Sequence, residues 1–286
     1  MKIKVLVLIV AAAVFAVSGC STADRELSED PAELMEIYCF SAGKADAHLI
    51  YGEDWAVLID CGEKGFGGDI LGYMDAHGID RIDRLIITHF DKDHVGGAAK
   101  VINNTEIGSV YQSNCPKESK EYSKYLEALE EKGIEPVTVR ERVSFSEDGV
   151  DFTIDPPQMD SYEIDPSNNS SLITEIRFGE CSMLFAGDAE DARLDEYIGG
   201  GHGRFDLLKV PYHGHFQNSL KAFLESVSAE WAVITSSDEE PEDTETLTAL
   251  KETGTKVFLT RKSAVSVRCD GRHIEVSYDV PKEQSS

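Results

Sequence analysis

Four side chains that commonly bind metal ions stand within six positions of this sequence: His89, Asp91, Asp93 and His94. The apolar run 85–87 before them predicts a short buried strand, and the two glycines after them open a predicted helix. Charged turns are common, so a solvated acidic turn is the plain alternative. The pattern His-x-Asp-x-Asp-His followed by Gly-Gly is more specific than a run of charges, and we interpret it as part of a metal site.

Three more polar side chains directly follow predicted strands that are far apart in the chain: Asp60, Asp188 and His213. Taken singly, each has a simpler interpretation as a turn residue or a surface histidine. Sites in layered α/β proteins collect at strand ends, however, and both halves of this chain run through a strand hairpin, a helix and a further strand. The sequence therefore predicts a metal site shared between two half-sheets.

The spacing of apolar residues predicts the elements that position these side chains. Strands are expected at 36–40, 47–51, 55–59, 84–88, 107–112, 171–178, 182–185, 207–210, 231–235, 256–260, 264–269 and 273–278, with a meander across 137–154. Helices are expected at 67–77, 95–103, 119–132, 191–198, 216–227 and 244–253. A single domain over residues 35–280 accommodates all of them.

The composition restricts the classes of ligand. The 286 residues include 53 acidic and 27 basic side chains, which gives a formal net charge of −26. Because nucleic-acid binding depends on Lys and Arg that displace counterions from phosphates, this charge argues against a strong nucleic-acid-binding surface. A local metal site that accepts one phosphate is compatible with it.

The start of the chain predicts export and lipid attachment. A basic beginning, an apolar run over 5–17 and the sequence Val-Ser-Gly before Cys20 match a bacterial lipoprotein signal, in which residues 1–19 are removed and Cys20 is lipidated. An ordinary signal peptide or a membrane helix is the alternative, but the apolar run is short for a membrane span. Residues 20–34 then form a flexible tether and 281–286 a tail. We expect a protein anchored by this lipid on the extracytoplasmic side of the cell membrane.

Six motifs in order make the chain similar to the metallo-β-lactamase superfamily, and within it to the ComEC-like branch, named for the metallo-hydrolase domain of bacterial DNA-uptake proteins. The motifs lie at 43–50, 58–62, 88–97, 168–172, 185–189 and 207–214. The first resembles Gly-Gln-Gly-Asp-Ala-x-Leu-Ile, the third matches His-x-Asp-x-Asp-His-x-Gly-Gly and the fourth resembles Asn-Asn-x-Ser-Leu. The resemblance covers essentially the whole domain. It implies an α/β fold, the four-layer αβ/βα sandwich, with the site at one edge.

The resemblance also implies a role for each matched residue. Six residues are expected to bind metal: His89, Asp91, Asp93, His94, Asp188 and His213. Asp93 is in addition a candidate to hold or deprotonate the attacking water, and Asp46 and Asn169 are expected to be catalytic beside it. Three residues are expected around the ligands, where Asp60 would orient one of them: Asp60, Lys209 and His215.

Departures from the superfamily pattern bear on the metal. Enzymes acting on β-lactams usually carry His where Asp91 stands and another His between the two halves, but this chain has no His between His94 and His202. The nearest replacements are Asn168, Asn169 and Ser171. One or two divalent ions are expected, and the oxygen-rich first position favours Mn²⁺ over Zn²⁺.

These features predict a metal-dependent hydrolase, phosphodiesterase-like or nuclease-like, whose substrate is a small-molecule or nucleic-acid phosphodiester. The departures among the ligands leave an alternative from another class, a lipoprotein that keeps the fold and binds a ligand or partner with little or no turnover. Hydrolysis of β-lactams suits an exported protein but fits this ligand set poorly.

Overall fold

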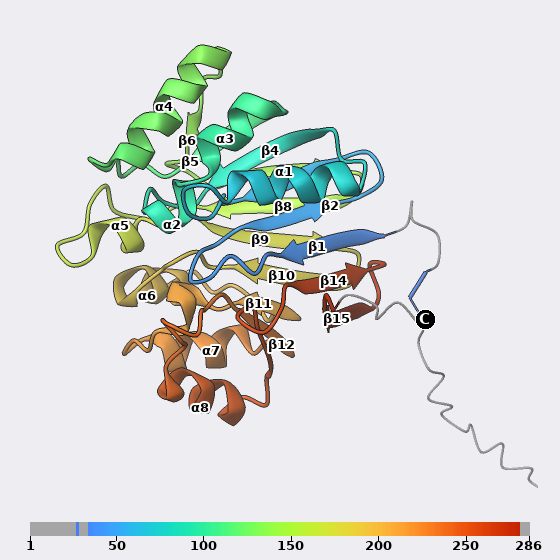
Figure 1. Ribbon diagram of the computed structural model, residues 1–286. Helices are drawn as coiled ribbons and strands as arrows, with labels where there is room; N and C mark the ends of the chain where they lie inside the picture. Colours follow the sequence, from blue (N-terminus) through green and yellow to red (C-terminus); the bar gives the residue numbers. More distant parts are fainter. Residues whose placement is uncertain (1–26, 29–33, 281–286) are drawn as a thin grey trace, which may run out of the picture.

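The computed structural model describes residues 27–28 and 34–280, and it shows two β-sheets packed face to face between two layers of helices (Figure 1). The predicted four-layer αβ/βα sandwich is therefore confirmed. The predicted signal peptide, Cys20 and the predicted tail at 281–286 lie outside the described residues. Among the residues that the structure describes, no helix is both long and apolar enough to cross a membrane.

The first sheet is built mainly from the N-terminal half of the chain and is completed by the last two strands. Its strands are β1 (Met35–Cys39), β2 (His48–Tyr51), β3 (Ala56–Ile59), β4 (Arg81–Ile87), β5 (Glu106–Gln112), β6 (Val137–Thr138), β14 (Val265–Cys269) and β15 (Ile274–Tyr278). Their order across the sheet is β15-β14-β1-β2-β3-β4-β5-β6. Because β3 and β4 are parallel neighbours, the residues that follow them emerge at the same edge.

The second sheet comes from the C-terminal half. Its strands are β7 (Val143–Glu147), β8 (Val150–Asp155), β9 (Ile173–Phe178), β10 (Cys181–Phe185), β11 (Leu207–Lys209), β12 (Trp231–Ile234) and β13 (Lys256–Leu259). They lie in the order β13-β12-β11-β10-β9-β8-β7. Strands β10, β11, β12 and β13 are parallel, so the segments after β10, β11 and β12 also meet at one edge.

Each sheet is buried on both faces, and the alternation of side chains explains how. In β3, Val57 and Ile59 belong to the apolar core between the two sheets, whereas Ala56 and Leu58 belong to the core beneath the helices. Successive residues of a strand point to opposite faces, so a strand covered on both sides must be apolar throughout. The unbroken apolar runs in the sequence follow from this.

Helices cover the outer face of each sheet. The first sheet carries α1 (Gly67–Ala76), α3 (Ala98–Asn104) and α4 (Lys120–Lys132), and the second carries α6 (Asp191–Gly199), α7 (Leu220–Val227) and α8 (Thr244–Glu252). Three shorter helical segments lie in the connections that carry the sequence motifs: α2 (Lys92–Val95), α5 (Pro166–Asn169) and the 3₁₀ segment η2 (Pro211–Gly214). In Figure 1, α2 and α5 lie at the same end of the molecule.

Three predicted elements differ from the structure. The meander expected at 137–154 is divided, because β6 pairs with β5 in the first sheet while β7 and β8 form a hairpin in the second. The helix expected at 95–103 is split into α2 and α3, with Gly96 and Gly97 between them. A Cβ on Gly97 would stand 2.1 Å from the carbonyl oxygen of Cys61, so close packing against the neighbouring loop sets this break. The helix expected from 216 begins only at Leu220.

Candidate metal centre

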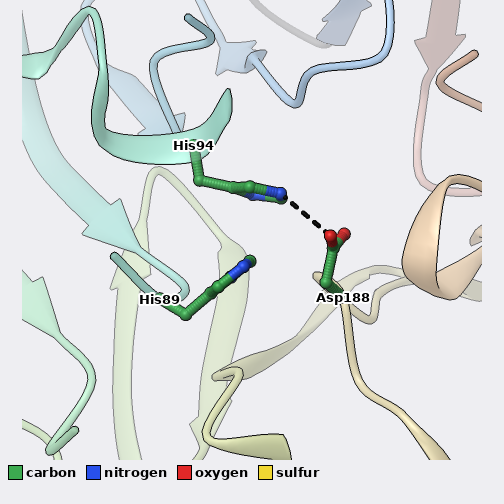
Figure 2. Close-up of side chains that lie close together, drawn as sticks. All are labelled: His89, His94 and Asp188. Atoms are coloured by element: carbon green, nitrogen blue, oxygen red, sulfur yellow. Dashed lines mark ion pairs between the residues drawn. The ribbon is translucent and has the colours of Figure 1, made fainter. Parts of the chain in front are cut away.

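The side chains predicted as ligands come from three strand-end segments of the two sheets, those after β4, β10 and β11. His89 follows β4, His94 lies in α2, Asp188 follows β10 and His213 lies in η2 after β11. All four are buried. Figure 2 shows His89, His94 and Asp188 with their rings and carboxylate pointing toward one another. The expected juxtaposition of residues 94, 188 and 213 across the two sheets is thus present in the fold.

Asp60 determines which nitrogen of His94 faces the centre. The Nδ1 atom of His94 lies 2.8 Å from Oδ2 of Asp60, and since a carboxylate only accepts, Nδ1 carries the proton and donates it. Asp60 is itself held by Thr88, whose backbone N–H and hydroxyl both donate to it. The remaining nitrogen of His94, Nε2, is therefore the one that is available for a ligand.

The same logic assigns the tautomers of the other two histidines. The hydroxyl of Thr235 donates to Oδ1 of Asp46 at 2.6 Å, so its oxygen accepts from Nδ1 of His213 at 3.0 Å. The hydroxyl of Thr88 donates to Asp60, so its oxygen accepts from Nδ1 of His89 at 3.1 Å. All three imidazoles consequently turn an Nε2 lone pair toward the centre.

Facing lone pairs in a buried site require a positive charge between them. Nε2 of His94 and Nε2 of His213 lie 3.2 Å and 3.0 Å from Oδ2 of Asp188. Among the described residues, Nε2 of His89, His94 and His213 and Oδ1 of Asp188 are buried without a hydrogen-bond partner. Either a proton or a metal ion resolves such a contact between acceptors.

The pKa values follow from this arrangement. Burial, helped by the neighbouring His94, lowers the pKa of the His89 imidazole to about 4, so this ring is neutral. Burial by itself also lowers the pKa of His94, but the carboxylates of Asp188 and Asp60 outweigh it and raise that pKa well above its usual range. The same Asp188 carboxylate raises the pKa of His213 against the effect of burial. The carboxylate of Asp188 thus favours a positive charge, from protons or from a metal ion, at the centre.

The donor set fits a divalent ion. Three groups of side chains offer ligand atoms that all lie within 4.8 Å of one another and include at least two predicted ligands: His89, His94 and Asp188; Asp93, His94 and His213; Asp46, Asp188 and His213. Three imidazole nitrogens, neutral once an ion takes the place of the protons on His94 and His213, suit Zn²⁺ together with carboxylate oxygens, and the carboxylates also suit Mn²⁺. The atoms without partners identify the first-choice ligands as His89, His94, His213 and Asp188.

Asp91 is placed differently from the other predicted ligands. Its Oδ1 lies 3.8 Å from Nε2 of His89, but the same oxygen accepts a hydrogen bond from the ammonium of Lys117 at 2.5 Å and another from the hydroxyl of Ser167. Asp91 belongs to none of the groups that bring three ligand atoms together among the described residues. It therefore stands at the margin of the centre, turned toward Lys117.

A cleft opens over the centre, and we call it the metal-site cleft. It has a volume of about 390 Å³ and is lined by Lys44, Asp91, Lys92, Asp93, Lys117, Ser119, Glu121, Asn168, Asp188 and Tyr212. Asp93 stands between the cleft and the ligands, because its Oδ2 lies 3.6 Å from Nε2 of His213. Burial by itself raises the pKa of Asp93, but His213 and His94 lower it well below its usual range, so the carboxylate is ionised.

Comparison with known proteins agrees with this geometry. The sequence pattern described as "Metallo-beta-lactamase superfamily" matches residues 41–234. The chain belongs to this superfamily. Among curated proteins, ComE operon protein 3 of Bacillus subtilis is 27% identical over 169 residues, which cover 58% of this chain and 21% of that protein. Recombination protein 2 of Haemophilus influenzae is 26% identical over 209 residues, covering 70% of this chain and 24% of that protein.

These relatives confirm the predicted likeness to the ComEC-like branch of the metallo-β-lactamase superfamily. The chain spans less than a quarter of the length of each of the two. Among solved structures, the metallo-beta-lactamase fold protein YhfI from Bacillus subtilis matches with a TM-score of 0.55 at 13% identity, over 85% of this chain and 100% of that one. This likeness concerns the fold.

Within the metallo-β-lactamase fold, Asp46 and Lys209 lie on the buried side of the ligands. The ammonium of Lys209 contacts Asp46, donates to the carbonyl oxygen of Gly187 at 3.0 Å and lies 3.7 Å from Asp188. Asp46 also accepts from Thr235, and it does not line the metal-site cleft. This placement differs from the catalytic role predicted for Asp46, because a carboxylate behind the ligands supports them without touching a substrate.

Asn169 and His215 are also placed apart from the centre. The amide of Asn169 donates to the carbonyl oxygen of Ile164 and accepts from the backbone N–H of Arg193, so backbone groups use both of its polar atoms. This differs from its predicted catalytic role and makes it a support of the loop before β9. His215, predicted to stand near the ligands, lies 3.7 Å from Asp243 and packs edge-on against Tyr212.

The sequence did not indicate two residues of the centre, Thr235 and Lys117, and it suggested a different role for a third, Ser171. Thr235 was only the end of a predicted strand, yet it orients His213. Ser171 was weighed as a ligand, whereas its hydroxyl lies 3.4 Å from Nδ1 of His89 and accepts from the backbone of Asp188. Lys117 carried no local signal, since it stands in a loop far from every motif. The strand-end position of Thr235 was the one usable clue.

Proposed function

We propose that this protein is a metal-dependent hydrolase of phosphodiesters, attached by a lipid on Cys20 to the extracytoplasmic face of the cell membrane. One observation carries the catalytic part of the proposal. Within the part of the chain that the structure describes, three buried imidazole nitrogens and one carboxylate oxygen face one another without hydrogen-bond partners beneath a cleft that holds three lysines. Membership in a superfamily of metal-dependent hydrolases supports the same reading.

The chemistry divides between the bound ion and the side chains of this chain. A divalent ion held by His89, His94, His213 and Asp188 would lower the pKa of a water and offset the charge of a phosphate. The ionised carboxylate of Asp93, next to His213 at the floor of the cleft, accepts a hydrogen bond from the attacking water and orients it. Thr235 and Asp60 keep the imidazoles in the tautomer that leaves Nε2 free.

The cleft is lined by charges of both signs, and its lysines offer contacts to an anionic substrate. Lys44, Lys92 and Lys117 line it beside four carboxylates, those of Asp91, Asp93, Glu121 and Asp188, so the lining is less acidic than the chain as a whole, which has 27 basic against 53 acidic residues. The ammonium of Lys44 lies 5.9 Å from the centre of the Tyr212 ring, and among the described residues it makes no ion pair. Lys44 is thus available to contact a phosphate, and a bound divalent ion would offset the carboxylates of the centre, while the acidic remainder of the chain disfavours long nucleic-acid contacts.

The nature of the phosphodiester is supported by the relatives. One of them is named Recombination protein 2, a name that refers to a process acting on nucleic acid. A nucleic-acid phosphodiester is therefore proposed first, with a small-molecule phosphodiester as the other member of the class. The lipid anchor and the location rest on the basic start, the apolar run and the sequence before Cys20.

The test uses full-length protein purified in detergent and stripped of metal. Addition of Mn²⁺ or Zn²⁺ should raise the melting temperature, since an ion at a hundred times its dissociation constant adds about 2.7 kcal/mol to the free energy of unfolding. The loaded protein should hydrolyse bis(p-nitrophenyl) phosphate and a single-stranded oligonucleotide. Comparing the two ions shows which one the centre prefers.

Matched variants make the assignment specific. Asp188→Ala should abolish both the melting shift and hydrolysis, whereas Asp195→Ala, an exposed residue of α6, should change neither. If neither ion shifts the melting temperature, the catalytic proposal fails in favour of a ligand-binding lipoprotein. Hydrolysis of nitrocefin without hydrolysis of the phosphodiesters would assign the protein to β-lactams instead. Loss of fatty-acid labelling in Cys20→Ser tests the anchor.

A further inference from the structure

A second cavity lies beside the metal-site cleft. It has a volume of about 360 Å³, and we call it the side cavity. Five of its lining residues come from the loop between β5 and α4 and from the N-terminal end of α5: Cys115, Pro116, Asp165, Pro166 and Ser167. None of these residues was expected to take part in the function, and none is a candidate metal ligand among the described residues.

The two cavities share one wall. Asp91, Lys117 and Asn168 line both of them. Lys117 donates to Oδ1 of Asp91 at 2.5 Å, and the two side chains remain 39% and 27% exposed. This half-exposed ion pair separates the two cavities. Such a pair contributes little to the free energy of folding, so the two side chains can move apart at low cost. The ammonium of Lys117 is thus accessible from both cavities, next to the metal ligands.

The side cavity differs from the cleft in chemistry. Its lining includes two proline rings and the Cys115 thiol, which offer apolar surface, with Ser167 and Asn168 as hydrogen-bonding groups at the shared side. Its charged groups are Lys117 at the wall and the carboxylates of Asp91 and Asp165. Two carboxylates against one ammonium disfavour a second phosphate there. An uncharged, flat group with a few polar atoms fits this lining better.

We propose that the metal-site cleft and the side cavity form one substrate-binding groove. The phosphate lies over the metal ligands with Lys117 as its contact, and the side cavity holds an uncharged ring substituent of that phosphate, such as the base and sugar of a nucleoside. The inference rests on the proposed phosphodiester chemistry and adds to it a binding site for the organic part of the substrate, which favours a nucleoside phosphate within the proposed class.

Lys117 is a positioning residue in this groove. Its ammonium now neutralises Asp91, and a phosphate placed in the cleft offers the same ammonium a second anionic partner. Removal of Lys117 takes away a charge-assisted hydrogen bond to the phosphate, so it should weaken phosphate binding roughly tenfold. The side cavity should then distinguish a nucleotide from free phosphate, since only the nucleotide fills it.

Cys115 provides a direct probe of occupancy. It is the half-buried cysteine among the described residues, whereas Cys39, Cys61, Cys181 and Cys269 are buried. The experiment measures the rate at which iodoacetamide alkylates Cys115 in full-length, Mn²⁺-loaded protein, with adenosine 5′-monophosphate, adenosine or inorganic phosphate present. Peptide mapping by mass spectrometry assigns the alkylated site, and Cys115→Ala confirms that assignment.

We expect the nucleotide, and not inorganic phosphate, to protect Cys115 from alkylation. Adenosine 5′-monophosphate at ten times its dissociation constant should slow alkylation of Cys115 about tenfold, because roughly a tenth of the protein is then free. Inorganic phosphate should bind but leave the rate unchanged, and adenosine alone should bind weakly. Lys117→Ala should raise the nucleotide concentration needed for protection about tenfold, while Lys124→Ala, exposed on α4, should not.

Three outcomes overturn the inference. They are equal protection by inorganic phosphate and nucleotide, no protection by the nucleotide, and unchanged protection in Lys117→Ala. Because alkylation requires no turnover, this result is separate from the hydrolysis assay. A protein that hydrolyses phosphodiesters without protection of Cys115 keeps the proposed function and loses only the side-cavity site.

Discussion

Asp60 and His94 form a hydrogen bond of 2.8 Å between two fully buried side chains, and this contact sets the orientation of the imidazole at the centre. Asp60 follows β3, whereas His94 comes from the segment after β4, so the bond ties two neighbouring strand ends together. The backbone of Asp60 has a φ of 58°, an uncommon conformation for a residue other than glycine. A strained backbone that directs a buried carboxylate to a candidate ligand indicates a positioning role.

The first prediction concerns this bond. Asp60→Asn should weaken metal binding by roughly 10–100-fold, because loss of a carboxylate behind a ligating imidazole reduces its basicity and its orientation. Isothermal titration with Mn²⁺ and Zn²⁺ measures the change. Asp54→Asn, at an exposed turn, is the matched control and should bind as the wild type does. Equal affinity in Asp60→Asn and wild type would contradict the assigned role.

Much of this arrangement could be predicted from the sequence, because strands buried on both faces are apolar throughout, so that polar side chains shortly after such a run mark the end of the strand. That pattern predicted Asp60, His94, Asp188 and His213 as residues of the site. The pattern does not indicate the hydrogen-bond partners that other segments supply to them. Thr235 reaches His213 only because β12 lies beside β11 in the sheet.

Contacts from other segments also explain why some predicted site residues face away from the centre. Asn169 and Asp46 stand in sequence motifs with the ligands, but tertiary contacts turn their side chains toward Arg193 and Lys209. Asp91 follows His89 by two positions, yet Lys117 from another loop holds it at the margin. Spacing along the chain locates a residue at the site, and the direction of its side chain depends on partners that only the fold brings near.

A second prediction concerns the buried pair of Lys209 and Asp46. Both side chains are 1% exposed, and the ammonium contacts the carboxylate directly. Lys209→Met should therefore lower the free energy of unfolding by about 3–5 kcal/mol, because it leaves a buried carboxylate without its counterion. Urea unfolding in the presence of EDTA measures this without interference from metal.

The double variant Lys209→Met/Asp46→Asn provides the control for this pair. It removes both charges, so it should be more stable than Lys209→Met alone. A double variant that loses the sum of the two single effects would show that the charges act independently, which would contradict the pairing.

A third prediction uses two glycines. Gly97→Ala should destabilise the protein by about 1–3 kcal/mol, because its Cβ would lie 2.1 Å from the carbonyl oxygen of Cys61 and would push α3 from the loop after β3. Gly68→Ala, exposed in the first turn of α1 with no atom within 4 Å of the new Cβ, should be neutral or stabilising by up to about 1 kcal/mol. Thermal unfolding of both variants checks the contrast, and an equal loss in both would contradict it.

The last prediction concerns Arg193, a fully buried cation that supports the loop before β9. Its guanidinium donates to Oδ1 of Asp155 at 2.6 Å and to the carbonyl oxygen of Ser171 at 3.1 Å. Arg193→Met should cost about 3 kcal/mol near neutral pH, because Asp155 loses its buried partner and keeps only the half-exposed Arg142. Urea unfolding measures the loss, and Arg204→Met, an exposed arginine, is the control.

The dependence of this loss on pH tests its cause. Burial by itself raises the pKa of Asp155, but the guanidinium of Arg193 outweighs it and holds that pKa below its ordinary value of 3.8. The native state therefore binds fewer protons than the unfolded state, and the contribution of the pair is fully present above pH 3.8 and is lost as the pH falls through the lower native pKa. The difference in unfolding free energy between wild type and Arg193→Met should accordingly shrink in acid. A difference that stays constant from neutral pH into acid would mean that Arg193 acts through packing and its bond to Ser171, without the charge of Asp155.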